Sequence, residues 1–517
     1  MHRVHWILAC MFAIVSLTAN GASTTTTDGR LDPTFGDSGR VYLGWAADSG
    51  VTPYDVAIAV LAPSDGSVIV VGNGTDSGVN YGSYNAICIA KLTAAGTFDT
   101  SFGNDLTTLG QSKIHGDGAN YQISATSAAL QSDGKIVIAG NVHYASGKQT
   151  AAVWRLNTNG TLDSGFGFLG ASFIDRNMPD QFDSANAVLV VQGTQGTGNA
   201  GLEGRIVVAG SYDFDPGLVL SQAWMVQLDS FGLPIGSDAN GLGSNTFDWP
   251  ECSDPYHDLT FSAIRMAVRA DTGALTYYLA GNCIPRNNGG DHPYHVPFIA
   301  AVDPTLHFVT AFGNNDVGIS TVANHDSNGF IVLASDSTIT SLDVDATGSH
   351  LVYAGNDTDG TYLLAYAGAL DAHSGQFDPS WGYGGAGNAY FNGNSSRAWS
   401  VLIDHTRGSH VSALVAGVDA CLPSPTICLL NPGYSFAVKT LGEGWPVPYC
   451  YTTAQCSYQF TGETNQGAYA MAYAHDGKVL LAGYLLIGPR SDFAVMRLQG
   501  GDEVFLDGFG VPSQGFR

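Results

Sequence analysis

The sequence predicts an all-β fold, a seven-bladed β-propeller built from four-stranded antiparallel blades. The first observation is the phrase DGKIVIAG at residues 133–140, in which Asp-Gly supplies a tight hairpin turn and the apolar run reads as a buried strand. The second is that variants of this phrase recur at a near-constant period, which is typical of repeat architectures. The copies end, 62 to 74 residues apart, at Gly72, Gly140, Gly210, Gly281, Gly355, Gly417 and Gly483.

The third observation is that other strand-like segments hold fixed places within each period. A run of small and apolar residues precedes the turn, as at Asp55–Leu61, Ala125–Leu130, Ala185–Val191 and Ala468–Ala474. A further strand follows the glycine, as at Ile87–Leu92, Ala151–Leu156, Ala223–Leu228, Phe436–Leu441 and Phe493–Leu498. Four-stranded sheets bury both faces by packing radially around a channel. The alternative, a β-helix, has coils much shorter than this period.

A turn of the form Leu/Phe-Asp-x-x-Phe/Trp-Gly and a fourth strand complete the unit. The turn occurs at Leu31–Gly36, Phe98–Gly103, Leu162–Gly167 and Phe377–Gly382, and shortened at Leu506–Gly510. A fourth strand follows at Arg40–Trp45 and at Asn388–Phe391. The phrases LDPTFGDSGRV, LQSDGKIVIAG and AAVWRLNTNGTLDSGFG resemble the delta-60 repeat family of bacterial exported and surface proteins. The resemblance, from about Leu31 to Gly510, implies a propeller and export, and it implies no reaction, catalytic residue or cofactor.

The first 21 residues read as a signal peptide, with Arg3, an apolar run from Trp6 to Leu17 and a small-x-small site ending at Gly21. We therefore expect an exported chain, whether secreted, periplasmic or held at the cell surface, with residues 22–517 forming one propeller domain. No later stretch has the roughly 18 apolar residues of a membrane span. The formal charge is −25, and −26 without Arg3, which opposes binding to nucleic acids and to anionic membranes.

Seven cysteines follow the signal peptide, and an oxidising compartment permits disulfides. Closeness in sequence predicts the pairs Cys421–Cys428 and Cys450–Cys456. Cys252 and Cys283 flank one hairpin and are expected to join its ends. Cys88 lies in an apolar strand and is expected to remain a buried thiol.

A cation or polar residue recurs just before the last leucine of the third strand, and an aspartate follows in three repeats. These residues are Lys91, Arg155, Gln227, Thr440 and Arg497, with Asp99, Asp163 and Asp507. They could form a ring of charges around the channel, but repetition favours a structural contact within each blade. Separately, Asp55, Asp183 and Asp258 precede innermost-type strands. They are candidates for a catalytic rim at the channel mouth, although capping of turns explains them better.

Three further patterns in the sequence resemble ligand-binding motifs. His257, Asp258, Asp291, His292 and His295 bring together groups that hold transition metals, but their spacing fits no zinc motif. Residues 213–217 and 355–360 space acids as calcium loops do, without the glutamate of an EF-hand loop. Gly382, Gly384 and Gly387 match a dinucleotide pattern without a following helix, so we reject that interpretation. No metal or catalytic residue is assigned from sequence.

The predicted function is that of an exported binding or surface-interaction module, monomeric, with an unidentified extracellular protein or carbohydrate ligand. The alternatives are an extracellular hydrolase or lyase acting on polysaccharide, with its site at one channel mouth, and a purely structural surface component. Whether the protein is an enzyme stays open at this point. A final hypothesis concerns the ends of the chain: Arg40–Trp45 is expected to pair beside Phe493–Leu498 as the outer strand of the last blade, which would close the ring.

Overall fold

A computed structural model of the chain describes residues 31–499 with internal gaps. The gaps fall at residues 46–54, 76–85, 104–108, 118–119, 176–181, 216–219, 237–243, 248–258, 284–294, 314–318, 323–335, 359–362, 379–380, 382–388, 391–395, 405–411, 420–435, 443–444, 447–456, 459–465 and 488–489. The described residues contain no α-helix, and one short 3-10 helix, η1, spans Ala200–Leu202. No helix in this part of the chain is long and apolar enough to cross a membrane.

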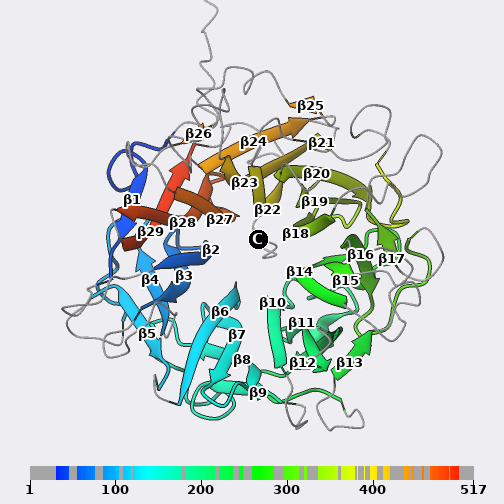
Figure 1. Cartoon of the computed structure of the whole chain (residues 1–517), viewed down its shortest axis with the longest axis horizontal. Coiled ribbons are helices and arrows are strands. Elements are labelled where there is room, and N and C mark those ends of the chain that lie inside the picture. The colour runs from blue at the N-terminus through cyan, green and yellow to red at the C-terminus, as the bar shows by residue number, and fades with distance from the viewer. Residues whose placement is uncertain are drawn as a thin grey trace, which may run out of the picture.

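The protein is a propeller-like ring of antiparallel sheets, and its strands occupy four successive distances from the centre (Figure 1). The innermost strands are β2 (Val56–Leu61), β6 (Tyr121–Leu130), β10 (Phe182–Val190), β14 (Leu259–Val268), β18 (Asp336–Val344), β22 (Ser396–Asp404) and β27 (Gln466–Tyr473). The second strands are β3 (Val68–Gly74), β7 (Ile136–Tyr144), β11 (Ile206–Asp215), β15 (Leu275–Cys283), β19 (His350–Thr358), β23 (Ser412–Asp419) and β28 (Val479–Ile487).

The third and outer strands follow the order predicted from the period. The third strands are β4 (Ala86–Leu92), β8 (Gln149–Leu156), β12 (Leu220–Leu228), β16 (Val296–Val302), β20 (Leu363–Asp371), β24 (Phe436–Gly442) and β29 (Arg490–Leu498). The outer strands are β1 (Arg40–Leu43), β5 (Gln111–His115), β9 (Ala171–Ile174), β13 (Ser244–Phe247), β17 (Ile319–Thr321), β21 (Ala389–Tyr390), β25 (Trp445–Pro446) and β26 (Ser457–Tyr458).

The hydrogen bonding does not divide these strands into seven separate four-stranded sheets, so that prediction needs correction. Four sheets have four strands, one has eight and one has five. The eight-stranded sheet joins the β6–β9 and β10–β13 units, because Phe182 forms a parallel pair with Gln149. The five-stranded sheet arises because β24 pairs at its outer edge with two short segments, β25 and β26.

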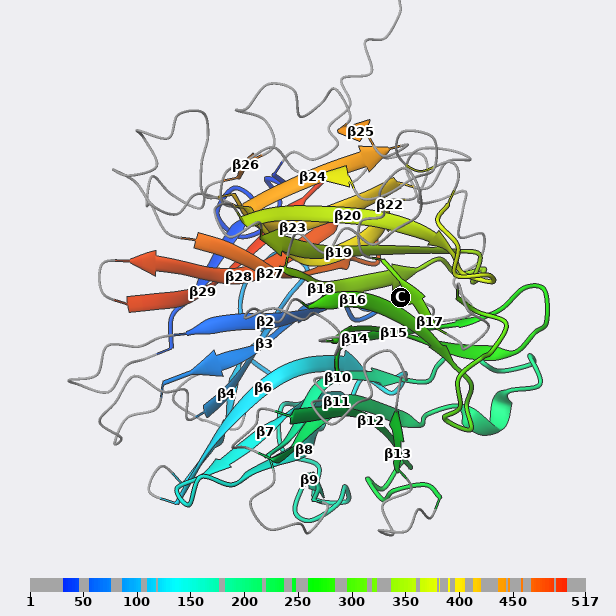
Figure 2. The ribbon, with the colours of Figure 1, turned by 45° about the vertical axis from the view of Figure 1, so that its right-hand side comes forward.

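The two ends of the described chain meet in one sheet. β1 pairs antiparallel with β29 in the register Arg40↔Met496 to Leu43↔Phe493, as the sequence predicts for these segments. On the other side of this sheet, β28 and β29 lie beside β2 and β3, although they come from opposite ends of the chain (Figure 2). One buried cluster crosses this boundary, with Val68 and Val70 on one side and Leu480 and Val495 on the other.

A β-bulge interrupts every innermost strand at the same place, and the repeat glycine of the second strand lies opposite the residue before it. In β6, for example, Ala125 pairs with Gly140 and the register shifts before Ser127. A Cβ atom on Gly140 would lie 1.9 Å from the carbonyl oxygen of Ser124. The corresponding distance at all seven repeat glycines is between 1.8 and 2.5 Å. No side chain fits there, which explains why the phrase always ends in glycine.

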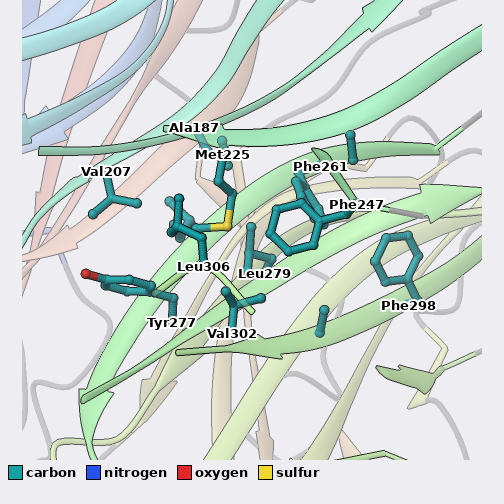
Figure 3. Close-up of a cluster of buried hydrophobic side chains, with 14 of the residues drawn as sticks. Ala187, Val207, Met225, Phe247, Phe261, Tyr277, Leu279, Phe298, Val302 and Leu306 are labelled. Carbon is teal, nitrogen blue, oxygen red and sulfur yellow. The ribbon is translucent and has the colours of Figure 1, made fainter. Parts of the chain in front are cut away.

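Neighbouring units are joined by buried side chains and by the asparagine that follows the repeat glycine. Asn73 accepts a hydrogen bond from the Ala125 amide at 2.6 Å and donates one to the Ala125 carbonyl at 2.8 Å. Asn282 and Asn356 make the same two bonds with the next innermost strand, and Asn141 accepts one from the Ala185 amide. Apolar clusters fill the remaining space between units. Figure 3 shows one between β10–β13 and β14–β17, in which the Phe261 ring lies 5.5 Å from Phe247 and 6.1 Å from Phe298.

The structure describes only two of the seven cysteines for which predictions were made. Cys88 is a buried thiol in β4, as predicted. Cys283 is buried at the end of β15, and its predicted partner Cys252 lies outside the described residues. The pairs Cys421–Cys428 and Cys450–Cys456 also lie outside them, so all three disulfides stay predictions.

We expect Gly140→Ala to lower the free energy of unfolding by about 3 kcal/mol or more, because the new methyl group overlaps a carbonyl that is fixed in the ladder. Chemical denaturation of the mature protein measures the change. Gly201→Ala is the matched control, since a Cβ atom at Gly201 meets nothing within 4 Å. Equal effects of the two substitutions would contradict the steric explanation.

Candidate functional site

The cation near the end of the third strand is part of a joint between units and does not line the channel. In β8, Arg155 Nε donates to Asp163 Oδ2 at 2.8 Å, and Nη1 donates to the Ser230 carbonyl of the next unit at 2.6 Å. The guanidinium also lies 4.4 Å from the centre of the Phe166 ring. The structural interpretation of this recurring pair is therefore confirmed for Arg155.

The equivalent residues of two other units also take part in structural contacts. Lys91 Nζ lies 3.1 Å from Asp99 of its own unit, and Gln227 Nε2 donates to the Pro304 carbonyl of the next unit at 2.7 Å. The side chain of Thr440 lies outside the described residues. Gln227 therefore joins neighbouring units as Arg155 does, whereas the contact of Lys91 lies within one unit.

The partner predicted for Arg497 needs correction. Asp507 lies outside the described residues, and the position beside Arg497 is occupied by Asp32, from the other end of the chain. Arg497 Nε donates to Asp32 Oδ2 at 2.7 Å and Nη1 donates to the Ala94 carbonyl at 2.6 Å. The reason is that Leu31 bridges to Leu498, so the turn next to β29 is the N-terminal copy.

Asp32 reproduces the setting of Asp163. It receives Lys478 at 3.2 Å as Asp163 receives Lys135 at 3.0 Å, and Arg497 stacks 4.5 Å from Phe35. Burial alone would raise the pKa of Asp32, but hydrogen bonds from Thr34 and the charge of Arg497 outweigh it and lower this pKa to about 2. The carboxylate is therefore charged at neutral pH and contributes stability that is lost only as the pH falls below about 4.

The rim predicted from Asp55 and Asp183 is not observed. Both are buried, with exposed fractions of 0% and 1%, and each lies two residues before the residue that faces the repeat glycine. Asp258, the third candidate, lies outside the described residues. Asp55 and Asp183 are therefore equivalent residues of two repeats, and they do not line a channel mouth.

Asp55 nevertheless takes part in an unusual acid pair that the sequence patterns missed. Asp492, at the start of β29, is 2% exposed and interacts electrostatically with Asp55 across the boundary between the two ends of the chain. Burial is the main cause that raises the pKa of Asp55 to about 7. The hydrogen bond from the Thr75 amide opposes this shift, the Asp492 charge adds to it, and Lys113 opposes it. Arg490 binds the other side of Asp492 at 2.9 Å. No motif marks Asp492, since its partner is more than 400 residues away in sequence.

The metal and calcium hypotheses find little support among the described residues. His295 bonds Asp336 at 2.7 Å, while His257, Asp291 and His292 lie outside the described part of the chain. No group of three or more His, Cys, Asp or Glu residues suited to a metal ion occurs within that part. Asp213 and Asp357 lie in strands and accept hydrogen bonds from Ser221 and Ser337. The glycine pattern at 382–387 is also outside the described residues.

A band of exposed apolar side chains is the most prominent surface feature. Phe168 is 73% exposed, Leu169 67% and Phe231 64%. Every large apolar side chain that is exposed in the described part of the chain lies between residues 98 and 233, on three successive units. We call these residues the apolar band: Phe98, Leu109, Leu162, Phe168, Leu169, Phe173, Phe231 and Leu233.

Hydrogen bonds at the joints between units bring parts of the apolar band close together. The Gly167 amide, next to Phe168, donates to the Phe231 carbonyl at 2.7 Å. Ser172 Oγ, next to Phe173, donates to the Gly232 carbonyl at 2.7 Å. On the other side, Ser112 Oγ reaches the Gly160 carbonyl at 2.6 Å, close to Leu162. Sequence periodicity does not predict the apolar band. Its residues lie in turns and outer strands, where exposure follows from the tertiary structure.

The ring of antiparallel sheets places the chain in the β-propeller class. Residues 64–102 and 131–166 match a family described as "Domain of unknown function (DUF5122) beta-propeller". These segments hold the second and third strands of the β2–β5 and β6–β9 units. No curated protein matches the sequence of this chain.

Similar solved structures match this chain at low identity and with TM-scores below 0.5. They include the α-L-arabinofuranosidase Arb93A of Fusarium graminearum, with 9% identity, a TM-score of 0.41 and coverage of 75% of this chain and 96% of that one. Extracellular domains of Drosophila semaphorin 1b give 9% identity and a TM-score of 0.41, with 92% and 88% coverage. A Trypanosoma rangeli sialidase gives 9% identity and 0.37, with 86% coverage of this chain and 55% of the sialidase. Function is therefore argued from the chain's own residues.

We expect the stability of the wild-type protein to fall as the pH rises from about 4 to about 7 and to level off above. The folded state holds a proton on Asp55 in this range and the unfolded state does not. At about 1.4 kcal/mol per pKa unit, the loss is about 4 kcal/mol. Asp55→Asn removes the slope, whereas Asp133→Asn, at an exposed turn, leaves it intact. Thermal unfolding midpoints between pH 4 and 8 test this, and an unchanged slope in Asp55→Asn would refute it.

We expect Asp32→Ala to destabilise the whole protein by about 3–5 kcal/mol, because it leaves Arg497 buried without its carboxylate. Asp163→Ala breaks the equivalent pair within one unit and is the matched comparison. Both variants should shift the same cooperative transition in a denaturant titration. The prediction fails if the wild type shows a small early transition that is missing only in Asp32→Ala. That result would show that the N-terminal segment unfolds separately from the rest of the protein.

Proposed function

We propose that the protein is an exported β-propeller that acts as an interaction module and docks a partner protein on its apolar band. The observation that carries this proposal is the exposure of Phe168, Leu169 and Phe231 on adjoining loops. Soluble proteins rarely expose contiguous apolar patches of this kind unless the patch is an interaction surface. Exposed aromatic residues are also the type that dominates protein interfaces.

The charge of the chain favours a protein over the other classes of partner. A formal charge of −25 repels the phosphate backbone of nucleic acids and the anionic lipids of membrane surfaces. An apolar or basic face on a partner protein is compatible with both this charge and the apolar band.

We also infer that the units form seven blades and that the N-terminal segment closes the ring. The support is that the joint between the last and first units repeats the joint between internal units. The Gly36 amide donates to the Ala95 carbonyl at 2.8 Å, as the Gly167 amide donates to Phe231. Phe35 packs against Gly96 as Phe166 packs against Gly232. A ring of this kind has few unpaired edges and gives the apolar band a rigid support.

Export by cleavage near Gly21 and the three predicted disulfides complete the proposal. They rest on the apolar segment, the small-x-small site and the cysteine spacing of the sequence. In this setting the partner is a protein outside the cytoplasm or at the cell surface.

The proposal is tested by adding fluorescently labelled mature protein to cells of the source organism. We expect saturable surface binding that is abolished when the cells are first treated with proteinase K. The triple variant Phe168→Ser, Leu169→Ser, Phe231→Ser should bind at least tenfold more weakly, with an unchanged unfolding midpoint because these side chains are exposed. Asp133→Ser, at an exposed turn of the same unit, is the control and should bind as the wild type does.

Three results would overturn the proposal. The triple variant binds as tightly as the wild type, so the apolar band is not the docking surface. Binding survives protease treatment and is reproduced on phosphatidylcholine vesicles, so the partner is lipid. Light scattering shows a wild-type dimer that the triple variant converts to a monomer, so the band is covered by a second copy of the chain.

A further inference from the structure

The residue inserted at each bulge has a repeated structural role in four of the innermost strands. Its side chain donates to the main-chain carbonyl of the next innermost strand. The bonds are Thr126 to Ala185 at 2.6 Å, Asn186 to Phe261 at 2.8 Å, Ser262 to Ile339 at 2.9 Å and Thr340 to Ala398 at 2.9 Å. The innermost strands that carry these residues surround the centre of the ring (Figure 1). The contact between neighbouring units is therefore enough to explain a hydrogen-bonding side chain at this position.

Two adjacent units depart from this rule with aromatic residues. The bulge residue is Trp399 in β22 and Tyr469 in β27. Their ring centroids are 4.3 Å apart at 31°, and Tyr484 of β28 continues the row at 5.7 Å from Tyr469. All three side chains are partly exposed. We call these three residues the aromatic row.

A glycine makes room for the aromatic row. A Cβ atom on Gly467, two residues before Tyr469, would lie 2.8 Å from Tyr484 Cε1 and 3.4 Å from Trp399 Cζ3. Gly467 occupies the place of Ser124, Ser184 and Thr338 in other units. The absence of a side chain at Gly467 leaves room for the rings of two units to lie together.

The chemistry of the aromatic row favours an uncharged sugar as ligand. Ring faces and edges at a partly exposed wall match the C–H faces of a pyranose, and polar groups beside them fix its hydroxyls. Arg397, exposed two residues before Trp399, provides several hydrogen-bond donors. The formal charge of −25 disfavours acidic polysaccharides at long range.

We propose that the aromatic row Trp399–Tyr469–Tyr484, with Arg397 beside it, is a binding subsite for the sugar rings of a neutral glycan at the channel. This subsite lies on the β22 and β27 units, whereas the apolar band lies on units between residues 98 and 233. The two surfaces are therefore independent, and either proposal can fail without the other.

Isothermal titration calorimetry of the mature protein tests the subsite with cello-, xylo-, manno- and malto-hexaose as neutral probes, and with hexagalacturonate and decaproline for comparison. We expect at least one neutral hexasaccharide to bind. Trp399→Leu and Tyr469→Leu should each weaken it at least tenfold, because leucine keeps apolar packing between the units but offers no ring to stack. Thr340→Ala, at the equivalent bulge position outside the aromatic row, should retain wild-type affinity. Thermal unfolding of each variant confirms that it is folded.

The inference is overturned if none of the neutral hexasaccharides binds. It is also overturned if Trp399→Leu and Tyr469→Leu bind them as tightly as the wild type, which would leave the aromatic row with a packing role only. Tighter binding of hexagalacturonate would replace the neutral glycan by an acidic one. Binding of decaproline alone would make the row a peptide site, and none of these outcomes bears on the apolar band.

Discussion

The structure depends on one steric constraint, the absence of space for a Cβ atom opposite each bulge. With a carbonyl oxygen between 1.8 and 2.5 Å from that point, only glycine fits, and the second strand can then lie close to the innermost one. The bulge releases one residue from the ladder and turns its side chain toward the next unit. The asparagine after the glycine reaches the next bulge in turn. A single repeated contact therefore shapes the strand, the joint between units and the wall around the centre.

The joint at the ends of the chain shows how the same contacts serve a different connectivity. Asp32, Phe35 and Gly36 occupy, beside β29, the positions that Asp163, Phe166 and Gly167 occupy beside β8. At the internal joint, Arg155 and Asp163 are only eight residues apart, so a short turn brings them together. The terminal version must bring together residues 465 positions apart, so its loop-closure entropy is larger. The same buried ion pair and aromatic contact occur at both joints, and at the terminal joint they offset this cost.

The sequence was sufficient for the strands and their order, because a glycine, a turn and an alternating pattern are local signals. It also predicted that β1 pairs with β29, since one end lacked the strand that the other end had in surplus. It was wrong about the partner of Arg497, because Asp507, at the spacing of the repeat, was preferred to Asp32. The catalytic rim considered for Asp55 and Asp183 is not observed, because both side chains are buried, and their burial depends on tertiary packing. Asp492 and the apolar band were missed for the same reason: no period or spacing marks a contact between distant segments.

Repetition also indicates where function is to be sought. A contact that recurs in several units, such as Arg155–Asp163 or Thr126–Ala185, is explained by the ring and needs no ligand. The residues that differ from their equivalents are of two kinds here. Some still serve packing: Val41 takes the outer-strand place of Ser172 and lies against Gly36. Others are exposed. Trp399 and Tyr469 replace the hydrogen-bonding residue of other bulges and are partly exposed, and Phe168 and Phe231 are exposed in turns. Exposure of an apolar or aromatic side chain separates the second kind from the first, and it assigns the two candidate surfaces to different sets of units.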